Sequence, residues 1–139
     1  MNNAYSSNNE SPLDQTFNFL NEKHSRPLIT VDNVIIAEDQ NELNILLIQR
    51  RNEPFSNCWA LPGGFILKNE SPFLAAYRKL KSETNLTQIP LFLIGVFGEP
   101  YRDPRGWVIS LAFSAIVKKS NIIPFAGDDE EKADWFELN

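Results

Sequence analysis

The sequence predicts a single α/β (α+β) domain in which a mixed β-sheet packs against helices. Two observations predict this class. Runs rich in apolar and β-branched residues recur along the chain between polar loops that contain Pro and Gly. One amphipathic stretch near the middle has helical periodicity instead. The length of 139 residues suits one domain with its own core.

The strand pattern is clearest in five segments. Strands are expected at residues 27–37, 44–50, 90–98, 107–117 and 133–138. The first two are expected to form an antiparallel hairpin, because the residues between them are polar and turn-like. A polar connection that ends in the acidic run 128–131 is expected before the last strand.

The N-terminal region divides into two parts. Residues 1–12 are rich in Asn and Ser and too poor in apolar residues to offset ordering entropy, so a disordered leader is expected. Leu13, Phe17 and Leu20 then recur at helical spacing, which predicts a short helix over 13–23. The single domain is therefore expected to span residues 13–139.

The charge and cysteine content narrow the possible partners and the compartment. The formal net charge is −5, whereas general nucleic-acid or membrane-surface binders are usually basic, so neither partner is expected. A small anionic ligand is compatible, because the local field of a pocket can oppose the net charge. The one cysteine, Cys58, excludes an internal disulfide, and no apolar run approaches the length of a membrane span. A cytoplasmic protein is expected.

The stretch from Trp59 to Leu86 predicts a strand end, a loop at Gly63 and Gly64, and a helix. Adjacent glycines allow close approach of a ligand, although most such pairs are only turns. Ser71 suits the N-cap, Pro72 the first helical position and Asn85 the C-cap. The expected apolar stripe is Phe73, Ala76, Tyr77 and Leu80, and the side chains expected away from it are Arg78, Lys81, Ser82 and Glu83.

This loop and helix resemble the Nudix box, whose pattern is G-x5-E-x7-R-E-U-x-E-E-x-G-U with U apolar. The matching positions are Gly64, Glu70, Arg78, Leu80, Glu83 and Leu86. Lys79 and Ser82 stand where the family has Glu, and Asn85 stands where it has Gly.

The flanks of the box resemble the ADP-ribose pyrophosphatase-like branch of the Nudix hydrolase superfamily, which is related to the Nudix domain of NAD-metabolism transcriptional regulators. The segments that carry this resemblance are TVD at 30–32, LLIQRR at 46–51, WALPGGF at 59–65, FGEPYRDPRGWVISLAF at 97–113 and GDDEEKADWF at 127–136. The resemblance covers residues 27–138 and implies the Nudix fold, a mixed sheet sandwiched by helices.

In that family the glutamates of the box bind Mg²⁺, which bridges the diphosphate and helps to generate the attacking hydroxide. The resemblance therefore makes Glu70 and Glu83 the candidate catalytic and metal-binding residues, with Mg²⁺ as cofactor if the protein is active and none otherwise. Here the face formed by residues 79, 82 and 83 carries one positive and one negative charge, so this Nudix box is degenerate.

Two compensations are open for the degenerate box. The acidic run 128–131 could lend a carboxylate, or it could be only a solvated loop. Alternatively, the Lys79 ammonium could pair with a diphosphate directly and bind it without metal, or it could be only a solvated helix residue.

Further ligand contacts are expected from the strand end at 50–51 and from the RDPRG loop. The full set of expected ligand-binding residues is Arg50, Arg51, Gly63, Gly64, Arg78, Lys79, Phe97, Tyr101, Arg102, Asp103 and Arg105. Phe97 and Tyr101 could stack on adenine or belong to the core, and Asp103 could instead pair with an arginine to rigidify its turn. The tryptophans Trp59, Trp107 and Trp135 are assigned to packing.

Two functions follow from these expectations. The first is recognition of ADP-ribose, or a related nucleoside-diphosphate-linked NAD metabolite, with weak or no turnover. The alternative is an active Mg²⁺-dependent ADP-ribose pyrophosphatase that releases AMP and ribose 5-phosphate. The family fold usually ends in a helix that covers the sheet, and three explanations of its absence from this sequence stay open: a fold without that helix, a chain cut short of it, or a face covered by a partner, such as a second copy in a homodimer.

Overall fold

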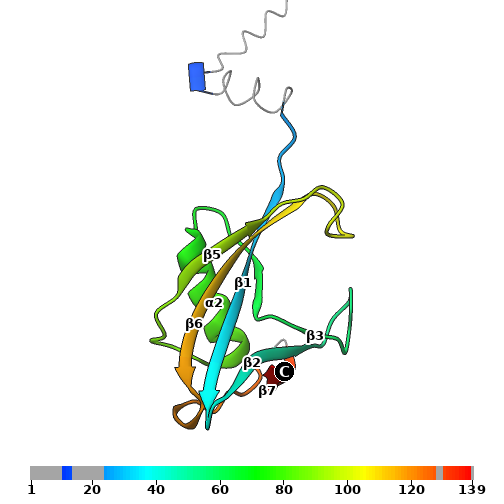
Figure 1. Cartoon of the computed structure of the whole chain (residues 1–139). Coiled ribbons are helices and arrows are strands. Elements are labelled where there is room, and N and C mark those ends of the chain that lie inside the picture. The colour runs from blue at the N-terminus through cyan, green and yellow to red at the C-terminus, as the bar shows by residue number, and fades with distance from the viewer. Residues whose placement is uncertain (1–10, 14–23, 128–129, 139) are drawn as a thin grey trace, which may run out of the picture.

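A seven-stranded mixed sheet forms the frame of the molecule (Figure 1). The computed structural model describes residues 11–13, 24–127 and 130–138. The strands run in the order β3-β2-β1-β6-β5, with β4 paired to β1 and β7 paired to β2. Their bounds are β1 Leu28–Asp39, β2 Glu42–Arg50, β3 Trp59–Ala60, β4 Gly63–Phe65, β5 Phe92–Phe97, β6 Val108–Lys118 and β7 Glu130–Leu138, and a 3-10 helix η1 spans Lys119–Asn121.

Strand β1 lies at the centre of the sheet and changes partner along its length. Its whole length pairs in parallel with β6. On the other side, its first half pairs with β4 and its second half with β2, both antiparallel, and the second pairing confirms the predicted hairpin. This change of partner places Asp32 directly opposite Gly63. The expected loop at Gly63 and Gly64 (the glycine loop below) is wrong in this respect, because both residues pair with β1 and belong to the three-residue strand β4.

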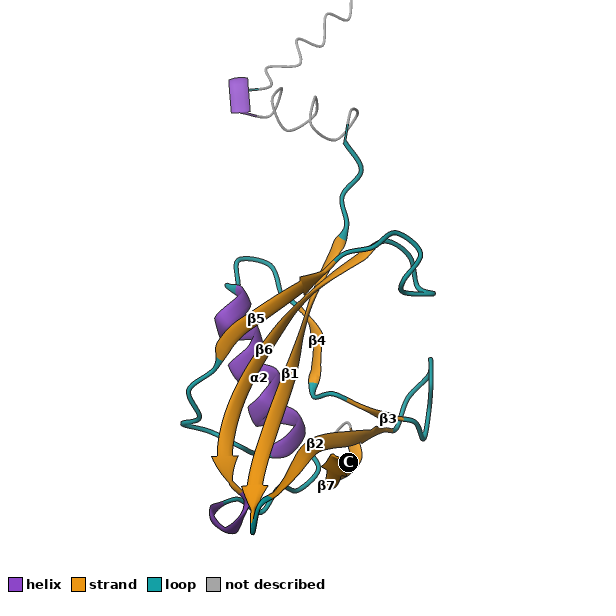
Figure 2. Ribbon diagram, in the orientation of Figure 1, coloured by secondary structure: helices purple, strands orange, loops and turns teal. Residues whose placement is uncertain are grey.

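The helix α2 (Pro72–Thr84) crosses one face of β1, β6 and β5 (Figure 2). Both predicted caps are confirmed: the Ser71 side chain accepts a hydrogen bond from the Leu74 N–H, and Asn85 adopts φ 59°. The core lies between this helix and the sheet, and its largest fully buried side chains include Val31, Ile35, Leu46, Leu80 and Phe113. The predicted mixed sheet packed against a helix is therefore confirmed.

The buried face of α2 differs from the predicted stripe. Glu83 was expected away from it, but the residue is only 4% exposed, whereas Phe73 is 47% exposed and touches the core through an edge-on contact of its ring with Phe113. The expectation for Glu83 was wrong because its carboxylate has polar partners inside the fold, which a count of apolar residues cannot reveal.

The last strand begins earlier than predicted. β7 starts at Glu130, which pairs with Arg50 of β2 and is 8% exposed. The expected polar loop over the whole acidic run is therefore wrong at Glu130 and Glu131. Residues 128–129, most of the predicted 1–12 leader and most of the predicted 13–23 helix lie outside the described residues. Across the described ranges, the helices are too short or too polar to cross a membrane.

Candidate ligand-binding site

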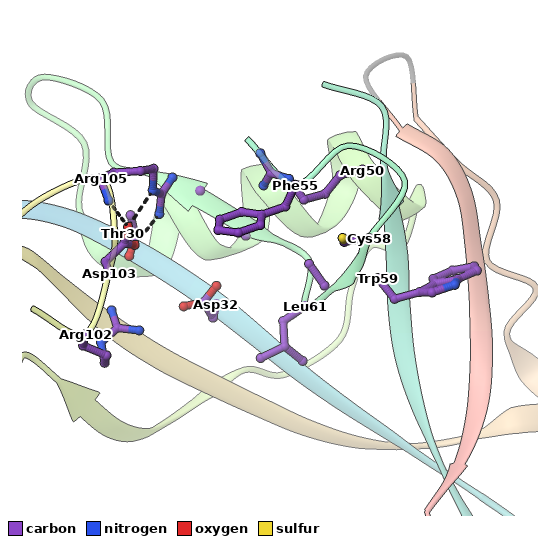
Figure 3. Close-up of a pocket in the computed structure, with 13 residues that line it drawn as sticks. Thr30, Asp32, Arg50, Phe55, Cys58, Trp59, Leu61, Arg102, Asp103 and Arg105 are labelled. Carbon is purple, nitrogen blue, oxygen red and sulfur yellow. Dashed lines mark hydrogen bonds and ion pairs between the residues drawn. The ribbon is translucent and has the colours of Figure 1, made fainter. Parts of the chain in front are cut away.

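A cavity of about 440 Å³ opens where four segments meet: the first half of β1, the loop before β3, the glycine loop and the loop between β5 and β6 (Figure 3). The loop before β3 and the loop between β5 and β6 project from the same side of the sheet (Figure 2). Side chains that line the cavity include Asp32, Arg50, Trp59, Arg102, Asp103 and Arg105. The cavity is therefore built from residues far apart in the sequence.

A second cavity of about 320 Å³ adjoins the first. Both are lined by Arg50, Gly63, Gly64 and Arg105. The second is lined in addition by Lys79 and Glu83 of α2 and by Glu130 of β7. The glycine loop thus forms a wall common to the two cavities, and one ligand can contact both.

Gly63 requires glycine because backbone atoms of β1 lie too close for a Cβ atom, and Gly64 requires it because of its positive φ. At Gly63 a Cβ would meet the Val31 carbonyl oxygen and would lie 2.8 Å from Asp32 Oδ1. At Gly64, where φ is +156°, a Cβ would lie 2.8 Å from Lys79 Cε. β1 lies against Gly63 and Lys79 lies against Gly64, and close approach of a ligand at these glycines stays a prediction.

The Lys79 ammonium occupies the end of the glycine loop by pairing with Glu83. Lys79 Nζ lies 2.5 Å from Glu83 Oε1, and the two side chains are 20% and 5% exposed. The other carboxylate oxygen, Oε2, accepts a hydrogen bond of 2.8 Å from the Gly63 N–H. Burial raises the pKa of the Glu83 carboxyl, and the Lys79 ammonium and the Gly63 N–H oppose that rise. Both oxygens of Glu83 are thus engaged.

Glu70 forms a second ion pair, with Arg78, outside both cavities. The pair is bidentate, with Arg78 Nε 2.6 Å from Oε1 and Nη2 2.9 Å from Oε2. The Leu67 N–H also donates to Oε2, and Arg78 donates to the Phe65 carbonyl. The Arg78 guanidinium, helped by the Leu67 N–H, lowers the pKa of Glu70 to about 2. These contacts fasten β4 and the following loop to the helix.

The described residues around the glycine loop do not fit Mg²⁺. Among the described residues, no three His, Cys, Asp or Glu side chains are grouped closely enough to hold a metal ion. Of the two candidate ligands predicted from the box, Glu83 is paired with an ammonium and Glu70 with a guanidinium. Ser82 donates its hydroxyl to the Lys79 carbonyl. A dication needs several carboxylate oxygens facing one point, and this helix face does not supply them.

The RDPRG loop is held in shape by a pair within the loop. Arg105 contacts both oxygens of Asp103, at 2.9 Å from Nε and 2.7 Å from Nη2, and lowers the pKa of Asp103 to about 2. The Arg105 guanidinium also lies over the Phe65 ring, 5.0 Å from its centroid. The predicted pairing of Asp103 with an arginine is confirmed, and the loop is tied to β4.

The structure brings most, but not all, of the predicted ligand residues to the two cavities. Arg50 and Arg51 lie there with hydrogen bonds to the carbonyls of Pro54 and Glu130, respectively. The structure does not bring Arg78, Phe97 and Tyr101 to either glycine-lined cavity. Tyr101 is 97% exposed and lines a separate hollow with Trp107. Stacking of Phe97 or Tyr101 on a base stays a prediction.

Several lining residues were not among the predicted ligand contacts. They include Thr30, Asp32, Phe55, Trp59 and Leu61. Trp59, assigned to packing, does stack edge-on with Phe136 but also lines the cavity. The one available signal for Asp32 was its position in the TVD segment, because its place beside Gly63 depends on the register of the three-residue strand β4.

Comparison with known proteins identifies the family. The family model of the NUDIX domain matches residues 27–139, so the chain belongs to the Nudix family. It is 42% identical over 113 residues to an ADP-ribose pyrophosphatase of Methanocaldococcus jannaschii, which covers 81% of this chain and 63% of that protein. It is 43% identical over 93 residues to the ADPR responsive transcriptional repressor NtrR of Acinetobacter baylyi, covering 66% of this chain and 37% of the repressor.

Solved structures agree with the sequence relatives. The NUDIX domain of Shewanella oneidensis NrtR, in a cocrystal with ADP ribose, superposes with a TM-score of 0.78 at 27% identity, covering 92% of this chain and 84% of that one. The predicted Nudix resemblance and Nudix fold are thereby confirmed. The chain spans less than two thirds of the length of the two sequence relatives.

Proposed function

We propose that this Nudix domain recognises ADP-ribose, or a closely related nucleoside-diphosphate-linked NAD metabolite, and turns it over weakly or not at all. The observation that carries the proposal is the pair between Lys79 and Glu83, 2.5 Å apart beside the glycine loop. An ammonium here occupies the helix face where the family pattern has carboxylates. The ligand class is supported by the relatives named for ADP-ribose and by the NrtR domain solved with ADP ribose.

The charges of the two cavities favour a diphosphate. The cations that line them outnumber the carboxylates: Arg50, Arg51, Lys79, Arg102 and Arg105 against Asp32, Glu83, Asp103 and Glu130. The chain as a whole carries a net charge of −5, so the site is a locally positive region of an acidic protein. Guanidinium groups bind phosphate oxygens in a bidentate manner, and an ammonium acts as a point charge. Binding therefore does not need a metal ion.

The alternative is an active Mg²⁺-dependent ADP-ribose pyrophosphatase that releases AMP and ribose 5-phosphate. The identity of 42% to a protein of that name favours it. It requires Lys79 to leave Glu83 and further carboxylates to approach, and Glu130, which lines the second cavity, is one described candidate.

One paired measurement separates the two functions. Calorimetric titration with ADP-ribose is carried out with Mg²⁺ and again with a chelator, and AMP release is followed in parallel. We expect equal affinity in both titrations and no AMP. The Arg102→Ala variant should bind about tenfold more weakly, whereas Arg26→Ala, an exposed residue before β1, should not. Rapid AMP release with Mg²⁺ contradicts the proposal and supports the alternative.

A further inference from the structure

Among the described residues, the carboxylate of Asp32 in the first cavity forms no ion pair within 4.0 Å, although its charge acts on Arg105 from a longer distance. Figure 3 shows it between the RDPRG loop and Leu61. Among the described residues, Ser110 is the hydrogen-bond donor to this carboxylate, through a short contact of its hydroxyl with Oδ2. Ser110 is 2% exposed and lies on β6, the parallel neighbour of β1, so the donor is fixed by the sheet. The orientation of Asp32 is therefore built into the fold.

The other oxygen, Oδ1, borders the glycine loop. Asp32 is directly opposite Gly63 in the β1–β4 ladder, and only the absence of a side chain at Gly63 leaves room for Oδ1 there. An ionised carboxylate has about four acceptor positions, of which Ser110 uses one. Positions on Asp32 thus remain for a ligand in the cavity.

The two carboxylates of this cavity differ in their partners. Asp103 is saturated by the bidentate contact with Arg105, whereas Asp32 has no ion pair within 4.0 Å among the described residues. A carboxylate next to a diphosphate repels it, so Asp32 does not serve the phosphates. The neutral donors that a nucleoside-diphosphate-linked sugar offers to such a group are its hydroxyls, and a carboxylate can accept both hydroxyls of a vicinal diol.

We propose that Asp32, oriented by Ser110, binds a ribose diol of the nucleotide ligand and so makes the cavity select ribosylated diphosphates over other diphosphates. This inference rests on the proposed function for the class of ligand. The arginines supply affinity for the diphosphate, and Asp32 supplies the preference for the sugar.

The test compares four ligands in the presence of a chelator: ADP-ribose, ADP, 2′,3′-dideoxy-ADP and inorganic pyrophosphate. The variants are Asp32→Asn and Ser110→Ala, and the matched control is Glu38→Gln, an exposed carboxylate on the same strand. Asp32→Asn should weaken ADP-ribose binding about 10- to 100-fold, the value of a lost charged hydrogen bond, and should leave pyrophosphate binding equal or tighter. Ser110→Ala should shift the preference in the same direction by a smaller factor.

The ligand series shows which ribose is bound. Weaker binding of ADP as well, but not of dideoxy-ADP, places the nucleoside diol at Asp32, and weaker binding of ADP-ribose alone places the terminal ribose there. If Asp32→Asn tightens ADP-ribose and pyrophosphate equally, Asp32 only balances the arginines and the inference is overturned. If Asp32→Asn does not fold, the Ser110→Ala variant decides through the ratio of its affinities for ADP-ribose and pyrophosphate, compared with the same ratio in the wild-type protein.

Failure of the proposed function gives a different result. In that case the wild-type protein does not bind ADP-ribose in chelator, whatever the variants do. If it binds only with Mg²⁺ and releases AMP, the preference is measured as kcat/KM for ADP-ribose relative to ADP. An unchanged ratio in both variants then overturns the role of Asp32.

Discussion

Two ion pairs of the box each join a basic residue of α2 to a glutamate, but they differ in what they do. Arg78 and Glu70 match the family pattern, and their bidentate contact fastens the loop after β4 to α2. Lys79 departs from that pattern, and its ammonium holds the buried Glu83 next to the glycine loop. Arg78 and Lys79 are adjacent in the sequence. One turn of the helix therefore carries both the pair of Arg78 with Glu70, called the bracing pair below, and the Lys79 side chain that lines the second cavity.

The difference shows that the contacts that hold the loop and helix together are independent of the metal face, which is the helix face formed by residues 79, 82 and 83. The bracing pair, the N-cap at Ser71 and the left-handed C-cap at Asn85 keep the loop and helix in place. None of these contacts involves residues 79, 82 or 83. The face toward the ligand can therefore exchange carboxylates for an ammonium and a hydroxyl without loss of the fold.

The largest expected effect comes from restoring the metal face. Lys79→Glu combined with Ser82→Glu places three carboxylates at positions 79, 82 and 83, where Mg²⁺ can find several oxygen ligands. A bound Mg²⁺ provides several kcal/mol of charge stabilisation, so we expect Mg²⁺-dependent AMP release from ADP-ribose to rise about a hundredfold. AMP release at saturating ADP-ribose, with and without Mg²⁺, measures it.

The control for this double variant is Lys79→Gln with Ser82→Gln, which removes the ammonium but adds no carboxylate. It should show no such rise. If the glutamate variant gains nothing over the glutamine variant, weak turnover has a cause other than residues 79 and 82, and carboxylates at these positions are not sufficient to restore a metal site on this scaffold.

A smaller effect is expected when only the buried pair is broken. Lys79→Met keeps an unbranched side chain beneath Gly64 but leaves the Glu83 carboxylate buried without its ammonium. Removing one partner of a buried pair lowers the free energy of unfolding by about 3 kcal/mol at neutral pH. The loss should shrink at pH 5, because the pKa of Glu83 is already raised by burial and protonation removes the uncompensated charge.

Urea unfolding at pH 7 and pH 5 measures this change. Lys81→Met is the matched control, since Lys81 lies on the exposed side of the same helix, and it should change the free energy of unfolding by less than about 1 kcal/mol. Equal losses for the two variants would mean that the ammonium of Lys79 does not stabilise Glu83.

The contrast between the two pairs also separates what the sequence could predict from what it could not. The helix ends, the hairpin of β1 and β2 and the family were readable, because Ser71, Pro72 and Asn85 act locally and the box keeps its spacing. The burial of Glu83 was not readable, because it depends on the Gly63 N–H, which lies 20 residues away in the sequence. Lys79 had two open interpretations, and its contact with Glu83 shows that it is not merely a solvated residue.

The site was predictable where it follows the box and unpredictable where it depends on strand register. Arg50, Gly63, Gly64 and Lys79 were expected near a ligand and do lie together. Asp32 was missed as a site residue because its role depends on which residue of β4 lies opposite it. Phe97 was a candidate because it is an aromatic residue at a strand end, and it lines neither cavity. The bulge between Leu93 and Gly95 alters which side chains of β5 share a face, and no local pattern in the sequence indicates such a bulge.

The smallest effect is expected at the bracing pair, as a change in pH dependence. The pKa of Glu70 is about 2 in the folded protein against an ordinary value of 4.5. This pair therefore stabilises the fold fully above pH 4.5, and the contribution is lost as pH falls toward 2. Glu70→Gln should lower the Tm at pH 6, and the gap to the wild-type protein should close by pH 2, as thermal unfolding across that range would show. The pKa of Asp103 is also about 2, but its effect on stability is the same in the variant and the wild-type protein and therefore cancels from the difference in Tm. A gap that stays constant from pH 6 to 2 would show that Glu70 supports the loop by shape alone, and the charge of the bracing pair would then be dispensable, unlike that of Lys79 and Glu83.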